Sequence, residues 1–261
     1  MKYSFYAKTD PGRARENNED SVVFDDATHV AVLADGMGGY NAGEIASGMA
    51  TAFIKSELHR WLLEVSADAS DRDVRRAVEL CVENANRSIF NAANSNNQYT
   101  GMGTTLVVGV FRGRKLLLGH IGDSRCYRLR AGILTQITKD HSLLQEQIDA
   151  GLLTAAQAVN SPIKNLVTRA LGVDEVVLLE IHEHVVETGD LYVMCSDGLS
   201  DMVDDEAIAK IISTDRDLQQ MSDALVNAAN DGGGRDNISV LMVGVTESAE
   251  KRGLIARWLG K

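Results

Sequence analysis

The sequence predicts an α+β fold built from largely antiparallel sheets. Its apolar segments follow the order strands, two helices, many strands, two helices and a last strand. Short hairpin turns join most of the strand segments, and the long crossovers that parallel strands need are scarce. Helices that are separated from strands along the chain favour helical layers packed on antiparallel sheets.

The first part of the chain carries three strand segments and two long helices. Residues 2–8 alternate polar and aromatic side chains, as a half-buried strand does, and 21–25 and 29–35 are two further strands. Apolar side chains recur at close to the helical period over 42–65 and 71–94. These apolar stripes predict two helices that face the core.

Hairpins and two shorter helices are expected in the rest of the chain. Residues 140–172 combine a helical stretch with irregular chain, and helices are expected over 204–212 and 217–229. A glycine-rich loop, 231–235, precedes the last strand, 238–245. Further strand segments are predicted at 104–111, 115–121, 124–129, 133–137, 176–186 and 191–195.

Length and composition indicate one domain that binds no nucleic acid. The chain has 261 residues and only 2 prolines, so no proline-rich linker divides it. Its net charge of -11 disfavours contact with phosphate backbones, which require clustered Lys and Arg. The acidic excess either serves solubility or includes metal ligands, and composition does not choose between these.

Composition also predicts a cytoplasmic protein without an integral membrane segment. No apolar stretch reaches the ~20 residues of a membrane helix, and the N-terminus lacks an apolar signal core. Cys81, Cys126 and Cys195 form no CxxC pair, which argues against a zinc site or a disulfide framework. Free cysteines of this kind suit a reducing compartment, so we expect a soluble cytoplasmic chain.

Four aspartates stand at the tips of apolar strands. Asp35, Asp123 and Asp197 each follow such a strand, and Asp236 opens the last one. Gathered carboxylates repel one another unless a cation lies between them, and all-oxygen ligands select Mg²⁺, Mn²⁺ or Ca²⁺. A single Asp-Gly pair such as Asp35-Gly36 is a turn with odds of roughly ten to one. Four acids in equivalent places favour a metal centre at one rim of the core.

A charged segment near the N-terminus allows two interpretations. Arg15, Glu19 and Asp20 fall in the stretch RARENNED, which is either a solvated turn or part of a phosphate site. In the second interpretation Arg15 grips a phosphate oxygen, because its planar fork donates paired hydrogen bonds to an oxyanion. Glu19 and Asp20 then hold waters that surround the metals.

These residues, in this order, resemble the metal-dependent protein phosphatase family of type 2C, and its single-domain bacterial members most closely. The similarity spans residues 2–245. The matching segments are RARENNEDS (13–21), VLADGMGGYNAGEIAS (32–47), GMGTTLVV (101–108), GHIGDSRCYRL (119–129), KDHSLLQEQIDAGLLT (139–154), VTRALG (167–172), LYVMCSDGLSD (191–201) and GGGRDNISVL (232–241).

The resemblance implies a ligand set. Asp35 would bridge two tightly bound Mn²⁺ or Mg²⁺ ions, the Gly36 carbonyl would bind one of them, and Asp197 and Asp236 would complete the first shell. Asp123, together with Asp197, would hold a third, weaker cation.

The resemblance also implies the roles of the N-terminal residues and the architecture. Arg15 matches the phosphate-binding arginine, and Glu19 and Asp20 match acids of the outer shell. The implied fold is a four-layer α-β-β-α sandwich with the metals at one end, formed by residues 1–245. Residues 140–170 match a flap beside the site, and we call them the flap. Residues 246–261 remain as a basic amphipathic tail, expected to be a short helix docked on the domain.

The implied reaction is hydrolysis of phosphoserine and phosphothreonine on proteins. A metal-activated water attacks phosphorus in line, and no covalent phosphoenzyme is needed. The expected partners are phosphorylated proteins, namely a bacterial serine/threonine kinase and its targets, and the chain is expected to be a monomer.

Two departures leave the proton donor to the leaving group unassigned. Family members carry histidine at the position of Met37 or of Tyr40, and this chain has neither histidine. The flap segment 160–165 also lacks the His-Pro often found there.

Three rival interpretations are weaker. Cys81 to Ser88 formally fits the C-x5-R-S loop of cysteine phosphatases, but the span has no glycine and lies in a helical pattern. The glycines 232–234 lack the Lys-Ser/Thr of a nucleotide loop. A phosphatase fold that only binds phosphoproteins has no support, since all the expected acids are present.

The six histidines show no metal-ligand spacing beyond His182-x-His184, which on a strand is typical of a solvated face.

Overall fold

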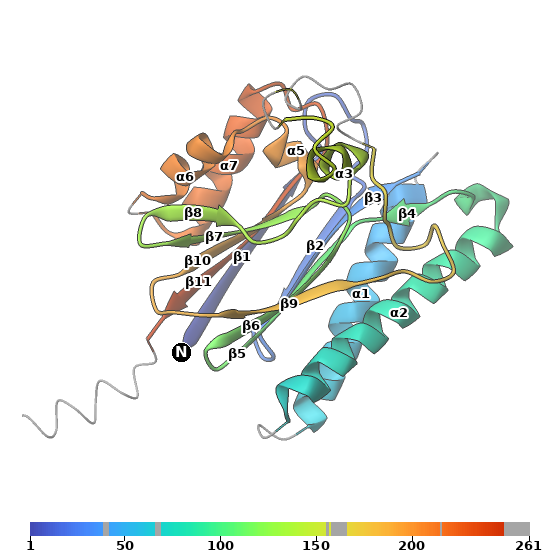
Figure 1. The fold of residues 1–261 in the computed structure, drawn as a ribbon, viewed down its shortest axis with the longest axis horizontal. Helices are drawn as coiled ribbons and strands as arrows, with labels where there is room; N and C mark the ends of the chain where they lie inside the picture. Colours follow the sequence, from blue (N-terminus) through green and yellow to red (C-terminus); the bar gives the residue numbers. More distant parts are fainter. Residues whose placement is uncertain (39–41, 66–68, 155–156, 158–165, 215, 248–261) are drawn as a thin grey trace, which may run out of the picture.

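The computed structural model consists of two antiparallel sheets packed face to face, with helices on both outer sides (Figure 1). It describes all residues except 39–41, 66–68, 155–156, 158–165, 215 and 248–261. The arrangement confirms the expected α+β class and the four-layer sandwich. The flap segment 160–165 and nearly all of the C-terminal tail lie outside the described residues.

Sheet one holds five strands, and the first and last strands of the fold pair with each other in it. Its outer face is covered by α5 (Asp197–Ser200), α6 (Asp205–Ile212) and α7 (Leu218–Asp231). The strand order is β1 (Lys2–Asp10), β11 (Ile238–Thr246), β10 (Leu191–Cys195), β7 (Arg125–Arg130) and β8 (Ile133–Gln136).

Sheet two holds six strands. Its outer face is covered by α1 (Ala42–Glu64) and α2 (Asp71–Ser95), and a 3₁₀ turn at Asn97–Tyr99 and α3 (Leu143–Asp149) complete the described elements. The strand order is β2 (Asp20–Asp25), β3 (Val30–Met37), β5 (Leu106–Arg112), β6 (Lys115–Ile121) and β9 (Glu180–Val185), with β4 (Gly103–Thr104) paired to β3.

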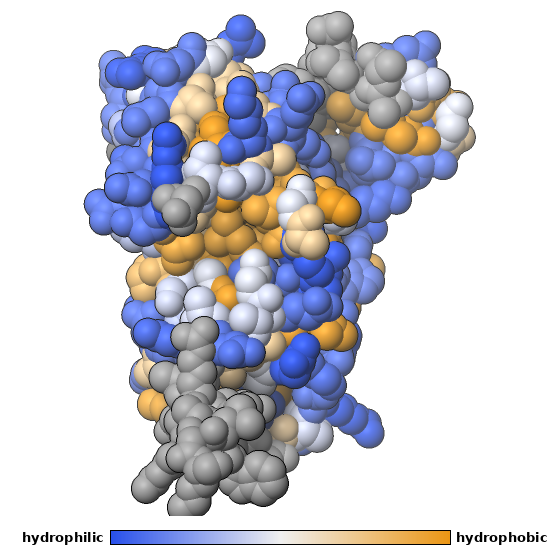
Figure 2. Space-filling model, turned by 90° about the vertical axis from the view of Figure 1, so that its left-hand side faces the viewer, coloured by the Kyte–Doolittle hydropathy of each residue, from blue (hydrophilic) through white to orange (hydrophobic). Residues whose placement is uncertain are grey.

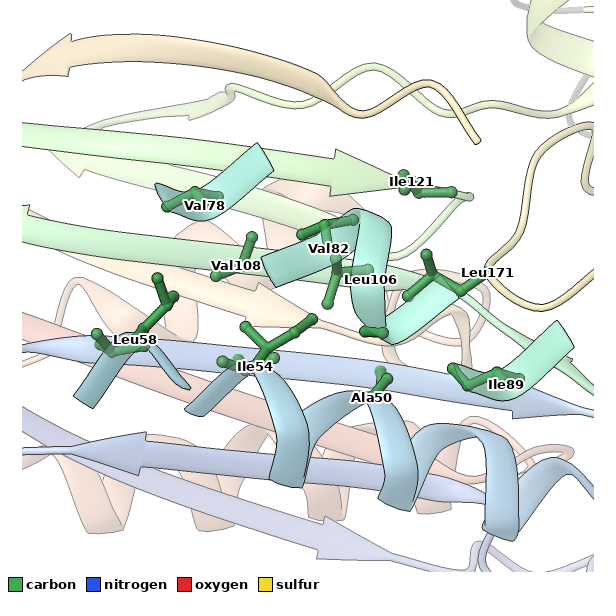
Figure 3. Close-up of a cluster of buried hydrophobic side chains, with 14 of the residues drawn as sticks. Ala50, Ile54, Leu58, Val78, Val82, Ile89, Leu106, Val108, Ile121 and Leu171 are labelled. Carbon is green, nitrogen blue, oxygen red and sulfur yellow. The ribbon is translucent and has the colours of Figure 1, made fainter. Parts of the chain in front are cut away.

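The core explains why the central strands are continuously apolar. Strands β3, β5, β10 and β11 are covered by helices on one face and by the other sheet on the opposite face, so nearly all their side chains are buried. Figure 3 shows the part between sheet two and its helices. It is built from Ala50, Ile54, Leu58, Val78, Val82, Ile89, Leu106 and Val108.

The helix boundaries follow local chemistry. Helix α2 begins where expected because Ser70 and Asp73 form a reciprocal capping box at its first turn. The short helix α5 was not predicted, because four residues are too few to display a helical period. Among the described helices, none combines the length and the apolar character needed to cross a membrane.

Most predicted strands end within two residues of the observed bounds, and two segments differ more. The segment 176–186 forms a strand only over Glu180–Val185, since β6 offers pairing partners no further than His120. The segment 104–111 is interrupted at Thr105, whose N–H donates to the Asp35 carbonyl. Hydrophobic patterning reports burial and does not reveal where a partner strand ends.

The sandwich is open along the edge strands β8 and β9. Figure 2 shows an apolar area in the middle of the side that lies at left in Figure 1. Ile133 of β8 and Val185 of β9 are exposed large apolar side chains. The polar side chains of His182, Glu183 and His184 on β9 disfavour pairing of this edge with another chain.

Candidate metal centre

A pocket of about 310 Å³ opens at one end of the sandwich, where strands of both sheets end. A larger hollow of about 550 Å³ beside Trp61 and Phe111 has a single acid, Asp71, among the lining residues that the structure describes, so its chemistry is less specific. The pocket brings together all but one of the residues expected from the sequence: Arg15, Glu19, Asp35, Gly36, Asp123, Asp197 and Asp236.

The strand directions bring the acids to this end. Asp20, the remaining expected residue, starts β2 and lies directly across from Asp35 near the end of β3. Asp123 follows β6, and Asp197 follows β10. Asp236 precedes β11, which runs antiparallel to β10, so its start lies beside the end of β10. Five aspartates from strands of both sheets therefore share one rim.

Hydrogen bonds fix the backbone of Asp35. Its N–H donates to the Thr105 hydroxyl at 3.0 Å. Its carbonyl accepts from the Thr104 hydroxyl and from the Thr105 N–H, both at 2.9 Å. These bonds fix the point on β3 from which the Asp35 side chain enters the lining of the pocket. Thr104 and Thr105 were not singled out from the sequence, and their only signal there was the break they make in an apolar strand.

Close packing, and not a turn, explains Gly36. Residues 35 and 36 both belong to β3, so the turn interpretation of this Asp-Gly pair is wrong. A Cβ added to Gly36 would lie 2.2 Å from the Gly43 carbonyl oxygen and 2.5 Å from that of Glu19. The Gly36 N–H donates to the same Glu19 carbonyl at 3.1 Å. Glycine is therefore required by the approach of β3 to the start of α1.

Asn237 ties the N-terminal charged segment to the start of β11. Its amide nitrogen donates to the carbonyls of Pro11 and Asn17, and its amide oxygen accepts from the Glu19 N–H at 2.8 Å. Asn237 is buried, so these bonds are shielded from water. The sequence analysis did not predict this structural role of Asn237. The one signal for it was a polar amide between Asp236 and an apolar strand.

Burial and mutual repulsion raise the pKa of Asp20, Asp35, Asp123 and Asp197 when no cation is present. Burial is the largest cause of each shift, and it raises the pKa of Asp197 to about 8 and that of Asp123 to about 6. It raises the pKa of Asp20 to about 7. The pKa of Asp35 lies well above its usual range, from burial first and then from the charges of Asp20 and Asp197. A centre with these properties favours a positive ligand.

The donor set fits a hard divalent cation. All candidate ligands are oxygens, which select Mg²⁺, Mn²⁺ or Ca²⁺ over softer metals. Ser196 donates to one carboxylate oxygen of Asp20 at 2.8 Å, while the other, Oδ1, is buried with no hydrogen-bond partner among the described groups. An orphaned buried carboxylate oxygen beside Asp35 is what a cation or its bound water would satisfy.

Arg15 lies at the mouth of the pocket. Its guanidinium donates to Asp236 Oδ2 at 2.7 Å, and its side chain is 52% exposed. The hydrogen bond and charge of Asp236 raise the pKa of Arg15 further, so it stays positive. Its exposure leaves donors free to meet a phosphate that enters from solvent.

Arg15→Ala is expected to lower kcat/KM on a phosphothreonine peptide by about ten- to a hundredfold, because a charge-assisted hydrogen bond contributes ~1.5–3 kcal/mol. The affinity for Mn²⁺, measured by calorimetry, should change little, since Arg15 is not a ligand. Arg13→Ala, an exposed arginine two residues away, serves as the matched control. Loss of Mn²⁺ binding in Arg15→Ala would instead make Arg15 a structural residue of the centre.

The cysteine-phosphatase alternative is excluded by the structure. Cys81 lies within α2, and burial raises the pKa of its thiol to about 11, so it is no thiolate at neutral pH. Arg87 is exposed on the same helix and pairs with Glu83.

Of the two positions where family members carry histidine, Met37 lines the pocket, whereas Tyr40 lies outside the described residues.

Comparison with known proteins identifies the family. A family model described as Protein phosphatase 2C matches residues 12–239. The chain is 36% identical over 239 residues to "Serine/threonine phosphatase stp" of Listeria innocua, an alignment that covers 90% of this chain and 93% of that protein.

Solved structures agree with this match. The crystal structure of serine/threonine phosphatase PstP/Ppp from Mycobacterium tuberculosis has a TM-score of 0.84 and 36% identity, over 95% of this chain and 100% of that one. The catalytic domain of PstP, solved in complex with two manganese ions, has a TM-score of 0.81 and 37% identity, over 94% of this chain and 99% of that one. Because the family model and these relatives match nearly the whole chain, it belongs to the protein phosphatase 2C family.

Proposed function

We propose that this pocket hydrolyses phosphoserine and phosphothreonine in proteins with the help of bound divalent cations. The observation that carries the proposal is the convergence of five buried or half-buried aspartates, from strands of both sheets, beside one exposed arginine. Relatives of this chain are named serine/threonine phosphatases, and the catalytic domain of PstP was solved with two manganese ions, which supports the proposal.

We assign the cation ligands by their positions. Asp35, the Gly36 carbonyl, Asp197 and Asp236 would hold two Mn²⁺ or Mg²⁺ ions, and Asp123 with Asp197 would hold a third, weaker one. Glu19 and Asp20 would accept hydrogen bonds from cation-bound waters. When bound, such cations acidify a water and neutralise charge on the phosphoryl oxygens.

The chain's own residues provide binding and orientation. Arg15 would hold the equatorial oxygens of the phosphate, where charge accumulates during in-line attack. Thr105 and Asn237 keep the ligand-bearing segments in register by the hydrogen bonds described above. No side chain is required as a covalent nucleophile.

The direct test is hydrolysis of a phosphothreonine peptide with and without Mn²⁺. Turnover is expected only with metal, and excess chelator should abolish it reversibly. Cys81→Ser should keep full activity and the full metal response, because the thiol is remote from the pocket. Unchanged turnover in excess chelator would overturn the proposed function.

Asp123→Asn is expected to lower kcat while the two tightly bound cations remain. Asp123 is buried and its charge repels that of Asp197, with which it would hold the third cation, so its loss should weaken the third site alone. Counting Mn²⁺ by calorimetry alongside kcat separates the sites. A variant with all metals bound and wild-type kcat would contradict this assignment.

We further propose the biological setting that the family similarity suggests. Residues 1–245 would form the catalytic domain, with 140–170 as its flap and 246–261 as a tail. The chain would act as a cytoplasmic monomer on a serine/threonine kinase and its targets. The three cysteines, free in the structure, fit a reducing compartment.

A further inference from the structure

A cluster of titratable side chains lies behind the turn that carries Asp123. The ligand-type atoms of His120, His141 and Glu180 lie within 4.8 Å of one another, although the residues are far apart in the sequence. His120 is at the end of β6, Glu180 opens β9 across from it, and His141 follows β8 at the start of the flap. The mechanism proposed above uses none of them.

We propose that His141 is a positioning residue for the phosphatase reaction: it clamps the Gly122 peptide and so holds Asp123 in place. This inference rests on the proposed role of Asp123 as a cation ligand. In this inference His120, His141 and Glu180 orient the metal centre and do not contact the substrate.

The clamp consists of two reciprocal hydrogen bonds. The Gly122 N–H donates to His141 Nδ1 at 3.2 Å, and the His141 N–H donates to the Gly122 carbonyl at 2.9 Å. One residue therefore engages both backbone groups of Gly122. Gly122 has φ of +99°, and a Cβ there would lie 2.7 Å from Thr105 Cγ2. Only glycine adopts this conformation without strain and without a clash with Thr105, and because a glycine backbone is otherwise free to vary, the two hydrogen bonds to His141 fix its position.

Glu180 selects the tautomer that the clamp needs. Because Nδ1 accepts a hydrogen bond, the ring proton of His141 must lie on Nε2, which faces Glu180 Oε2 at 3.1 Å. Glu180 also accepts from His182 Nε2 at 2.9 Å. Burial alone would raise the pKa of Glu180, but these two hydrogen bonds lower it, so the carboxylate is ionised at neutral pH.

The same contacts argue against a metal ion between these three side chains. A ligating imidazole normally donates its second nitrogen to a neighbour, whereas His141 Nδ1 accepts from a backbone N–H. Arg169 places a guanidinium nitrogen 3.4 Å from His141 Nε2, a longer contact than the 3.1 Å to Glu180 Oε2, so the Nε2 proton is directed at the carboxylate and the positive charge of Arg169 disfavours a metal ion there. The rings of His120 and His141 stack at 4.6 Å and 13°, so their in-plane lone pairs do not converge.

His141 also connects the Asp123 turn to the flap. Its carbonyl accepts from the Thr168 N–H at 2.8 Å, and the next residue, Ser142, pairs with Val167, which lines the pocket. His120 supports the ring of His141 by stacking, and its own Nε2 donates to the Lys139 carbonyl at 2.8 Å. Movement of His141 would therefore shift both the turn that carries Asp123 and the flap residue Val167.

Two substitutions of His141 separate the clamp from other roles. In His141→Asn the amide oxygen occupies the place of Nδ1 and can still accept from Gly122, whereas in His141→Gln it lies near the place of Nε2 and cannot. We expect His141→Gln to lower kcat at saturating Mn²⁺ by about 10–100-fold, the usual cost of losing an outer-shell partner. His141→Asn should keep most of the activity, and KM should change little in both.

A measurement that does not depend on activity tests the clamp itself. In the intact protein, long-range ¹H–¹⁵N spectra should show His141 protonated on Nε2 and not on Nδ1. The Gly122 amide should exchange slowly in wild type and His141→Asn, and rapidly in His141→Gln. Glu180→Gln should weaken the tautomer preference, while His184→Gln, a half-buried histidine on the same strand, should leave kcat and the Gly122 amide unchanged.

The outcomes distinguish this inference from the proposed function. A proton on His141 Nδ1, or equal kcat in the Asn and Gln variants, would overturn the positioning role. Wild-type kcat in Asp123→Asn would instead overturn the third cation site, and the Gly122 exchange rates would still decide whether His141 clamps the turn.

Discussion

Asp35→Asn is expected to reduce kcat on a phosphothreonine peptide by more than about a hundredfold, since even outer-shell changes at metal sites cost about 10–100-fold. Asp35 is repelled by the charges of Asp20, Asp123, Asp197 and Asp236, so all four other aspartates of the cluster act on it. A neutral amide there removes the charge that would face both tight cations. Steady-state kinetics at several Mn²⁺ concentrations measure the loss.

Asp35→Asn should have the opposite effect on the metal-free protein. Removing one of several repelling buried carboxylates relieves repulsion, so in chelator near pH 8 the variant should unfold at a higher temperature than wild type. With Mn²⁺ the order should reverse. Asp231→Asn, an exposed acid at the end of α7, should alter neither property. Lower stability of Asp35→Asn in chelator would show that the carboxylate serves folding and not metal binding.

Without metal, the free energy of unfolding is expected to fall as pH rises from about 4 to about 8. The folded-state pKa values of Asp123, Asp20 and Asp197 are raised to about 6, about 7 and about 8. At these aspartates the folded state therefore binds more protons than the unfolded state in this window, and we expect this to outweigh the opposite effect of His29, His120 and His184, whose pKa is lowered by burial. The contribution of these groups is fully present below the unfolded pKa and is lost as pH passes through the folded values.

Manganese should reverse this trend, because cations bind the deprotonated carboxylates. The rise in melting temperature on adding Mn²⁺ should be small near pH 5 and large near pH 8. The lowered pKa values of Asp25 and Asp190 do not offset the effect, since their stabilisation is complete once the pH is above the unfolded pKa. A melting temperature in chelator that increases between pH 5 and pH 8 would contradict the prediction.

Much of the fold was predictable because burial is written into local patterns. The central strands are apolar on both faces since a sheet and a helical layer cover them, and the stripes of α1 and α2 point into the core shown in Figure 3. Four acids of the site, Asp35, Asp123, Asp197 and Asp236, were found because each one stands beside an apolar strand segment, whereas Glu19 and Asp20 came from the charged N-terminal stretch and the family resemblance. The patterns did not reveal where strands end. Strand β9, for example, begins at Glu180 because the neighbouring strand β6 offers no pairing partner beyond His120.

The sequence by itself determined which residues are buried and which acids end strands, since both follow from side-chain chemistry within a few residues. Only the tertiary structure showed that Asp20 lies across from Asp35, that the backbone of Gly43 packs closely against Gly36, and that His141 accepts a hydrogen bond from Gly122. These contacts join segments whose separation carries no periodic signal. Their geometry depends on strand register and on the close packing of backbones, which exist only once both sheets have formed.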